Sequence, residues 1–196
     1  AAICADGNNM ELNNLSITLN TSTTTSVAGG LCFINSNANI YNSIIHDNTG
    51  GSVHVYSGIP TFAYSDIGGS GAPANWNTAF GINYGANIDI NPNWDANQKP
   101  YLCSPTVNGG TAAFGLEPLD LAGNTRIYGT VVDMGAYESV ASTQSTASAS
   151  ICAGIGNFYL FHNQQFSTAG QYTILLPGAA VGGCDSSVVL TLTVNT

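Results

Sequence analysis

Basic side chains are nearly absent from this sequence of 196 residues. Lys99 and Arg126 stand alone against eleven Asp and Glu residues, which gives a formal net charge of −9 at pH 7. A nucleic-acid partner requires several phosphate contacts from Lys or Arg, and attraction to anionic lipid requires the same charges. The composition therefore excludes nucleic acid and anionic lipid as partners.

Long apolar runs are also missing. No run approaches the roughly 20 residues of a membrane helix, so we expect no membrane insertion. The chain opens on Ala1-Ala2-Ile3-Cys4, which enters strand-like sequence without a signal-peptide pattern. We interpret the sequence as a mature piece, or a fragment, of a longer protein.

Charge of either sign is scarce, but apolar material is not. Only 7% of residues are charged, against about 25% in an ordinary globular protein. Hydrophobic residues reach 44%, which is enough to bury a core and excludes disorder. Asn, Ser, Thr and Gly supply the polarity, and these residues suit strands joined by tight turns. The sequence predicts an all-β fold.

A repeat runs through residues 3–67. Three segments align with offsets of 28 and 22 residues, and four aligned positions are apolar in every segment. These positions are Ile3/Leu31/Val53, Ala5/Phe33/Val55, Leu12/Ile40/Phe62 and Ile17/Ile45/Ile67. Units of 22 residues with alternating strands and no helix match the coils of a right-handed parallel β-helix. The alternative is a sandwich of hairpins, which explains the alternation but not the repeated spacing.

The same register places Cys4 over Cys32, at an outward position between two inward ones. Neighbouring coils hold such Cα atoms about 4.8 Å apart, a separation that a disulfide accepts. We therefore predict a Cys4–Cys32 disulfide. The alternative is two unpaired thiols.

The part of the chain that follows the repeat resembles a known family. The motifs are Asn87-Ile88-Asp89-Ile90-Asn91-Pro92, Ser104-Pro105-Thr106-Val107-Asn108-Gly109-Gly110, Asp120-Leu121-Ala122-Gly123-Asn124-Thr125-Arg126-Ile127 and Val132-Asp133-Met134-Gly135-Ala136-Tyr137-Glu138. In this order they resemble the closing segment of bacterial surface β-helix proteins of the choice-of-anchor type, which are common in Bacteroidetes-like organisms. The resemblance covers residues 1–140. It implies a right-handed parallel β-helix, export and attachment to the cell surface, but no reaction.

Four charged residues gather in this closing segment. Asp120, Asp133 and Glu138 surround Arg126, the only arginine. A guanidinium can bridge two carboxylates bidentately, so we predict a structural salt-bridge cluster that locks the last coil. The alternative is a calcium site, but the spacing matches no recognised calcium loop. We favour the lock and expect no cofactor.

The tail reads as a separate module. Small uncharged residues over 141–150 predict a linker, and residues 151–196 predict a small β-sandwich-like module. This part of the chain resembles a short module repeated in large extracellular Bacteroidetes proteins. The residues that carry the resemblance are Ile151-Cys152, Gly183-Cys184-Asp185-Ser186 and a final apolar strand. That resemblance implies a disulfide between Cys152 and Cys184. Cys103 is then left unpaired, as a buried small hydrophobe. Disulfide use places the chain outside the cytoplasm.

The chain offers little catalytic chemistry. Polysaccharide lyases need Lys or Arg beside the developing negative charge, and glycoside hydrolases need two carboxylates facing one cleft. Asp66 and Asp89 flank one face of the predicted coil, but coincidence explains so loose a pair. The histidines show no metal-ligand spacing; they are His46, His54 and His162. We predict that the chain is not an enzyme.

The favoured function is a non-enzymatic structural or adhesive protein of the bacterial cell surface. The first coil has no visible cap, so its edge invites a homo-oligomer or a fibre assembled head to tail. The alternatives are a carbohydrate-binding module or the remnant of a β-helix polysaccharide-degrading enzyme. Outward aromatic residues would carry carbohydrate binding, although each is more readily explained by a turn or the core. The candidates are Tyr41, His54, Tyr56, Tyr64, Trp76 and Trp94.

Overall fold

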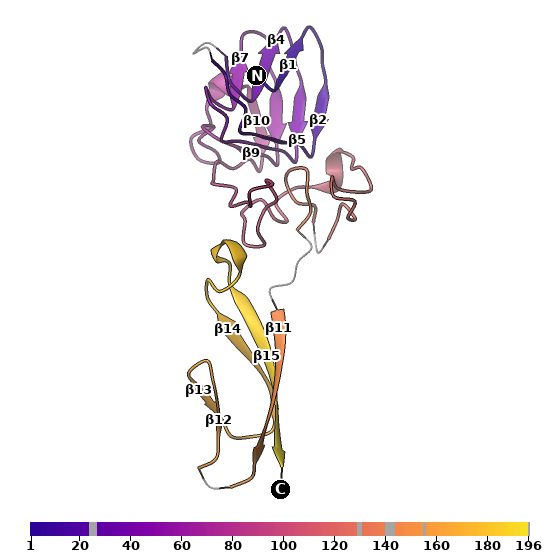
Figure 1. Cartoon of the computed structure of the whole chain (residues 1–196). Coiled ribbons are helices and arrows are strands. Elements are labelled where there is room, and N and C mark those ends of the chain that lie inside the picture. Colours follow the sequence, from indigo (N-terminus) through magenta and orange to yellow (C-terminus); the bar gives the residue numbers. More distant parts are fainter. Residues whose placement is uncertain (24–26, 129–130, 140–143, 155, 196) are drawn as a thin grey trace. The chain divides into compact units, whose positions relative to one another are not determined.

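The chain forms two compact units, Ala1–Val140 and Ala141–Thr196. A computed structural model describes residues 1–23, 27–128, 131–139, 144–154 and 156–195 (Figure 1). Strands and three short 3-10 helices make up the regular structure of these residues, so the predicted all-β class is confirmed. Within the described ranges, no helix has the length and apolarity to span a membrane.

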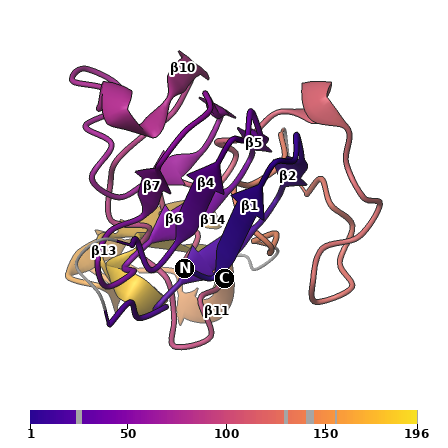
Figure 2. The same ribbon diagram turned by 90° about the horizontal axis from the view of Figure 1, so that it is seen from above.

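Three parallel sheets organise the first unit. Their strand orders are β1-β4-β7, β10-β8-β5-β2 and β3-β6-β9, and all pairings are parallel. The strands of the first sheet lie side by side in Figure 2. The elements of this unit are β1 (Ile3–Asp6), β2 (Glu11–Asn13), β3 (Ser16–Thr18), β4 (Leu31–Ile34), β5 (Asn39–Tyr41), β6 (Ile44–His46), β7 (Val53–Val55), β8 (Thr61–Ala63), β9 (Asp66–Ile67), η1 (Thr78–Phe80), β10 (Ile82–Gly85) and η2 (Ala112–Phe114).

Each sheet takes one strand from each of three repeats, namely β1–β3, β4–β6 and β7–β9. The predicted register is confirmed at all twelve apolar positions, from Ile3 opposite Leu31 to Ile45 opposite Ile67. Phe33, Ile40 and Phe62 are fully buried at the centre of the resulting core. Hairpins pair antiparallel, so the hairpin sandwich that we weighed for this part of the chain is excluded.

A partial fourth repeat continues the stack. β10 pairs with β8, and Ile88 forms a parallel bridge with Asp66. Trp76 and Phe80 pack against the core at this end, with the Trp76 ring centroid 5.8 Å from that of Phe62. Trp76 therefore covers the core and is not the outward sugar-binding residue that we considered.

The turns repeat with the strands. A left-handed residue follows the second strand of every repeat, with φ of 51° at Asn14, 48° at Asn42, 51° at Tyr64 and 54° at Ala86. Asn adopts this conformation more readily than other residues with a Cβ atom, which explains two of the four positions. The turn geometry thus follows the strand spacing even where the residue type does not favour it.

Polar side chains form ladders between repeats. The backbone N–H of Leu15 donates to Ser43 Oγ (3.1 Å), that of Ser43 to Ser65 Oγ (3.1 Å) and that of Ser65 to Asn87 Oδ1 (3.0 Å). Small hydroxyl and amide groups satisfy these buried amides without introducing charge. The ladders thereby account for a composition rich in Asn and Ser and poor in charge. A second ladder links Asn9, Asn37 and Ile59.

The prediction that the closing segment locks the last coil requires the segment to lie at the end of the stack. It does not lie there. Its residues 133–136 return to the first two repeats. The Gly135 N–H donates to the Asn42 carbonyl (2.7 Å), and the Ala136 N–H donates to Ser16 Oγ (3.0 Å). Gly135 has a φ of 93°, and a Cβ there would stand 2.8 Å from Ile44 Cδ1, so only glycine fits. The segment therefore runs along the side of the repeats.

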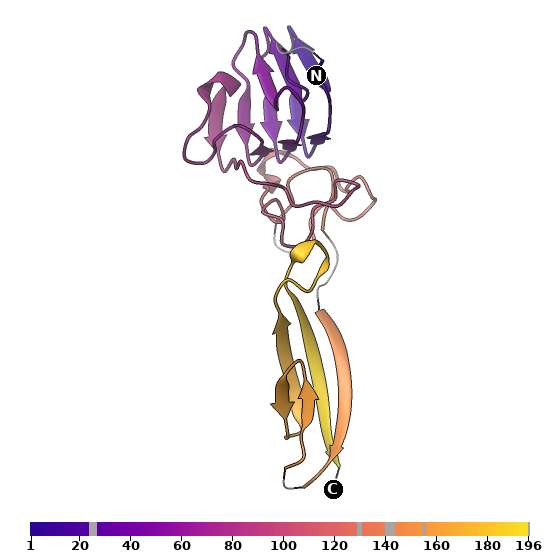
Figure 3. The ribbon, with the colours of Figure 1, turned by 60° about the vertical axis from the view of Figure 1, so that its left-hand side comes forward.

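The second unit contains a three-stranded sheet, ordered β11-β15-β14, and the β12-β13 hairpin (Figure 3). β15 pairs parallel with β11 and antiparallel with β14. The predicted linker is wrong over 144–150, because these residues belong to β11; residues 141–143 lie outside the described part. Val188, Leu190 and Leu192 alternate inward along β15 and supply the buried face that β11 extends. The elements are β11 (Gln144–Cys152), β12 (Tyr159–Phe161), β13 (Gln164–Phe166), β14 (Gly170–Leu176), η3 (Val181–Gly183) and β15 (Ser186–Asn195).

The serine ladder predicts a measurable loss of stability. Ser65→Ala removes the acceptor for the buried Ser43 N–H, so the free energy of unfolding falls by about 1–3 kcal/mol. Ser57→Ala is the matched control, because its hydroxyl serves the exposed Asn35 N–H, where water replaces it. Urea unfolding followed by tryptophan fluorescence measures the change, since both tryptophans lie in the first unit. Equal losses in the two variants would contradict the ladder's role.

Candidate functional site

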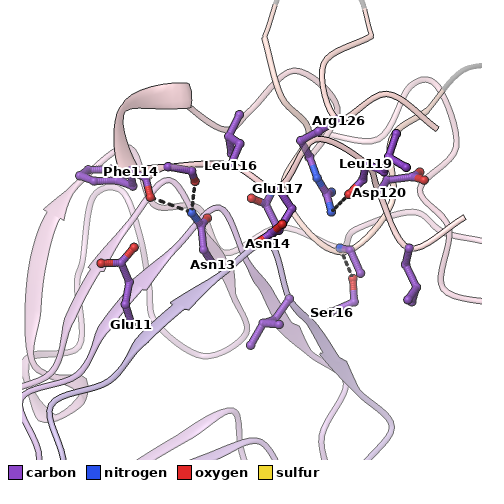
Figure 4. A pocket seen from close by; sticks show the side chains of 14 residues that line it. Glu11, Asn13, Asn14, Ser16, Phe114, Leu116, Glu117, Leu119, Asp120 and Arg126 are labelled. Carbon is purple, nitrogen blue, oxygen red and sulfur yellow. Dashed lines mark hydrogen bonds between the residues drawn. The ribbon is translucent and has the colours of Figure 1, made fainter. Parts of the chain in front are cut away.

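A groove of about 830 Å³ lies in the first unit (Figure 4). One wall is β2 and its turn into β3, and the other is the chain over residues 114–121. Arg126 and Ala136 complete the lining. We call this feature the groove.

Hydrogen bonds and ring stacking hold the second wall in place. Asn13 Nδ2 donates to the carbonyls of Phe114, at 3.0 Å, and Gly115. The Phe114 ring stacks on Tyr41 with centroids 3.8 Å apart and planes 9° from parallel. The Thr111 N–H donates to Asn42 Oδ1 (2.8 Å), just before η2. The wall is thus fixed at both ends of η2.

Strand β2 presents a free edge. It is the terminal strand of its sheet, and its neighbour β5 lies on one side only. The Asn39 N–H donates to the Met10 carbonyl, and the Asn14 N–H to the Tyr41 carbonyl, so alternate residues of this stretch face β5. The backbone N–H and C=O groups of Glu11 and Asn13 consequently point away from β5. No described strand lies on that side.

Both walls carry an exposed carboxylate, Glu11 on one and Glu117 on the other. Arg126 is the one basic residue of the lining, and its side chain is buried and directed to Glu138. The exposed charges of the groove lining are therefore acidic. Aliphatic side chains also line the groove, among them Leu116, Leu119 and Leu121.

The four charged residues of the closing segment do meet, and all four are buried. Arg126 Nη1 lies 3.8 Å from Glu138 Oε1, and its guanidinium also donates to the carbonyls of Gly135 (3.3 Å) and Leu119 (3.4 Å). The predicted bidentate bridge between two carboxylates is wrong. Arg126 Nε has no hydrogen-bond partner among the described residues.

The carboxylates of this cluster bind backbone amides instead. Asp120 accepts the N–H groups of Ala122, Asn124 and Glu138 (2.7–2.9 Å). Asp133 accepts those of Asn108 and Ser139, each at 2.7 Å. Two basic residues cannot pair with eleven acidic ones, and a carboxylate can accept several N–H donors. These hydrogen bonds hold the turns of the closing segment in one conformation.

Burial and hydrogen bonding shift the pKa values of the three carboxyl groups of the cluster in different directions. Burial, together with the charge of Asp133, raises the pKa of Glu138 to about 7. Burial also raises the pKa of Asp133, although its backbone hydrogen bonds oppose the change. Burial alone would raise the pKa of Asp120, but the hydrogen bonds from Glu138 and Asn124 outweigh it and leave that pKa lowered.

Asp66 and Asp89, which the sequence left as a coincidental pair, lie near His46. His46 Nε2 stands 4.0 Å from Asp89 Oδ1, and both Asp89 oxygens accept backbone amides, from Gly69 and Gly71. Asp66 is fully buried, and burial raises its pKa to about 7. Its Oδ2 lacks a partner in the described ranges. Neither carboxylate lines the groove.

Cys4 and Cys32 lie opposite each other on β1 and β4, as predicted, but as two free thiols. The predicted disulfide is not formed in this structure. Burial and a hydrogen bond with Cys4 together raise the pKa of the Cys32 thiol to about 11.

The disulfide implied between Cys152 and Cys184 is wrong. Cys152 is a free thiol, whereas Cys184 is disulfide-bonded. The parallel register pairs Cys152 with Asn195 and Gln144 with Ser187, so the strand separates Cys152 from the residues near Cys184. Eight residues of strand span about 26 Å, far beyond the 7 Å limit between disulfide Cα atoms. Cys103 is also disulfide-bonded, which corrects its assignment as an unpaired thiol.

The remaining candidate residues do not form one surface. Tyr41 is covered by Phe114, Tyr64 lies 6.2 Å from the same ring, and His54 contacts Tyr56. Tyr84 is 70% exposed but was not among the predicted residues. The irregular pairing of β10 with β8 interrupts the alternation of inward and outward side chains that would have indicated it. In the described ranges, no three His, Cys, Asp or Glu side chains are grouped to hold a metal ion.

The shifted carboxyl groups predict a pH-dependent stability. The folded pKa values of Glu138 and Asp66, about 7, exceed the ordinary values of 4.5 and 3.8. Each group's contribution is present below its ordinary pKa and is lost as pH rises through 7. The urea concentration at the unfolding midpoint of the first unit should therefore decrease as the pH is raised from 4.5 to 7.5. Glu138→Gln reduces this slope, whereas Glu117→Gln, at an exposed position, retains it; an unchanged slope in Glu138→Gln would contradict the assignment.

The cysteines differ in predicted reactivity. At pH 8 only about one Cys32 thiol in a thousand is ionised, given its pKa of about 11, and the side chain is 2% exposed. Iodoacetamide therefore modifies the exposed Cys152 in the native chain and leaves Cys32 unmodified. Mass spectrometry of the proteolytic peptides measures both, and urea-unfolded chain serves as the control in which Cys32 reacts. Equal native rates would refute the buried thiol.

Comparisons with known proteins identified no relative of this chain. Neither the protein-family models, the curated proteins nor the solved structures give a match to this chain. The functional argument therefore depends on the residues and geometry described above.

Proposed function

We propose that the chain is part of a non-enzymatic, extracellular structural or adhesive protein of the bacterial cell surface, built as a right-handed parallel β-helix. The observation that carries the proposal is the in-register stacking of three repeats in three parallel sheets. Such stacking produces a rigid element, because each repeat is held by its contacts with the neighbouring repeats.

The hydrogen bonds and the burial of the acidic side chains support a structural role. Asp89, Asp120 and Asp133 use their oxygens to accept backbone amides. Asp66 and Glu138 are buried. A catalytic carboxylate must instead reach a substrate in an open cleft. Of the described acidic side chains in the groove, only Glu11 and Glu117 are exposed.

Two further features support an extracellular location. Cys103 and Cys184 are disulfide-bonded, and disulfides persist mainly in oxidising compartments. Charged residues make up only 7% of the chain, and amide and hydroxyl ladders replace them. The resemblance of the closing segment to bacterial surface proteins agrees with this assignment.

The proposal does not extend to a fibre assembled head to tail. Such a fibre needs open edges at both ends of the stack. β1, β2 and β3 are edge strands at one end, but at the other end the insertion that carries Trp76 and Phe80 packs against the core, and only β10 and the Ile88 bridge continue the sheets. The carbohydrate-binding alternative has less support, because Phe114, the aromatic ring of the groove, already stacks on Tyr41.

Localisation and turnover test the proposal together. Immunogold labelling of intact producing cells is expected to place the protein on the outer surface, with permeabilised cells as the control for total antigen. Purified chain is expected to release neither reducing nor unsaturated sugar ends from a panel of acidic and neutral polysaccharides. Labelling confined to permeabilised cells would refute the surface role, and sugar release would refute the non-enzymatic one.

A further inference from the structure

We propose that the groove binds an extended peptide segment of another protein, which adds to the free edge of β2 and places Lys or Arg side chains against Glu11 and Glu117. This inference rests on the proposed adhesive function and names its ligand class. Three observations carry it: an unpaired strand edge, two unpaired carboxylates and a lining of exposed aliphatic side chains.

The strand edge supplies the hydrogen bonds. Glu11 and Asn13 direct their backbone N–H and C=O groups away from β5, and both residues line the groove. An extended peptide satisfies such groups by pairing as a further strand, which gives affinity without a demand on its sequence. Because β2 spans only Glu11–Asn13, the segment that pairs is short.

The carboxylates supply the charge preference. Glu11 and Glu117 are exposed, and neither forms an ion pair with a basic side chain in the described part of the chain. Lys99 stands over the Tyr137 ring, 5.0 Å from its centroid, and Arg126 is buried beside Glu138. A ligand with alternating basic residues meets this charge, since alternate side chains of a strand share one face.

The lining distinguishes a peptide from a sugar. Leu119 and Leu121 are 52% and 70% exposed beside the groove, and they offer aliphatic contacts to the side chains of a strand. A sugar ring prefers a free aromatic face, but Phe114 has one face on Tyr41. Apolar contact together with an open strand edge therefore favours a peptide.

The charge of the chain also argues against a second copy in the groove. Its net charge is −9, and both of its basic residues are engaged elsewhere. Two copies would bring their Glu11 and Glu117 carboxylates together without a cation to compensate them. The occupant that we infer is thus a basic segment of a different protein.

Fluorescence anisotropy tests the inference with the full chain at 50 mM salt. The probe is fluorescein-labelled Thr-Lys-Val-Lys-Thr-amide, and Thr-Gln-Val-Gln-Thr-amide is its uncharged counterpart. We expect the Lys peptide to bind about 3–10-fold more tightly, because an exposed ion pair contributes a factor of roughly 1.5–5. The preference falls at 300 mM salt. Equal binding of the two peptides, or no binding of either, would overturn the inference.

Matched variants locate the site. Glu11→Gln and Glu117→Gln should each weaken the Lys peptide about 1.5–5-fold. Asp6→Asn removes the same charge from an exposed position outside the lining and should leave affinity unchanged. A Lys peptide methylated on alternate backbone nitrogens should lose binding, because it cannot pair with β2. Retained binding by the methylated peptide, or an equal effect of Asp6→Asn, would refute strand addition in the groove.

Other occupants give different outcomes. Binding of a neutral oligosaccharide panel without binding of the Lys peptide would assign the groove to carbohydrate, and a concentration-dependent dimer in light scattering that Glu11→Gln strengthens would assign it to a second copy. Either result overturns the inference. Surface immunogold labelling is independent of these measurements: a labelled surface with no peptide binding leaves the proposed function standing, and an unlabelled surface refutes the function whether or not the peptide binds.

Discussion

Hydrogen bonding between consecutive repeats is the interaction on which the rest of the first unit depends. A parallel ladder fixes the register between strands, and a shift by one residue would turn the inward apolar positions outward. The spacing of 28 and 22 residues is therefore obeyed by the strands, the left-handed turns and the serine and asparagine ladders alike. The closing segment and the groove are built on the outer surface of this stack.

Scarcity of basic residues shapes how the chain uses its carboxylates. With two basic side chains for eleven acidic ones, most carboxylates cannot form ion pairs. Asp89, Asp120 and Asp133 accept backbone amides instead and thereby hold irregular segments in fixed turns. Asp66 and Glu138 are buried at the cost of a raised pKa. Only the carboxylates that remain exposed, such as Glu11 and Glu117, are available to a partner.

Local patterns were readable from the sequence when the same spacing recurred. Twelve apolar positions gave the register correctly, because inward positions of a stacked strand tolerate few polar residues. The fourth repeat escaped notice, since a long irregular insertion containing Trp76 and η1 precedes β10 and a bulge interrupts its pairing with β8. The linker prediction failed for a related reason. Small Ser, Thr and Ala residues form β11 because β15 offers a partner edge, and composition does not reveal that edge.

The sequence by itself determined the all-β class, the strand register and the apolar core of the first unit, because these follow from a local pattern repeated along the chain. It also brought Arg126, Asp120, Asp133 and Glu138 together as one cluster. Only the tertiary structure decided how that cluster bonds, which cysteines are linked and where the groove lies. These features depend on contacts between residues as distant in sequence as Asn13 and Phe114. The path of an irregular segment sets such contacts, and no repeated spacing encodes that path.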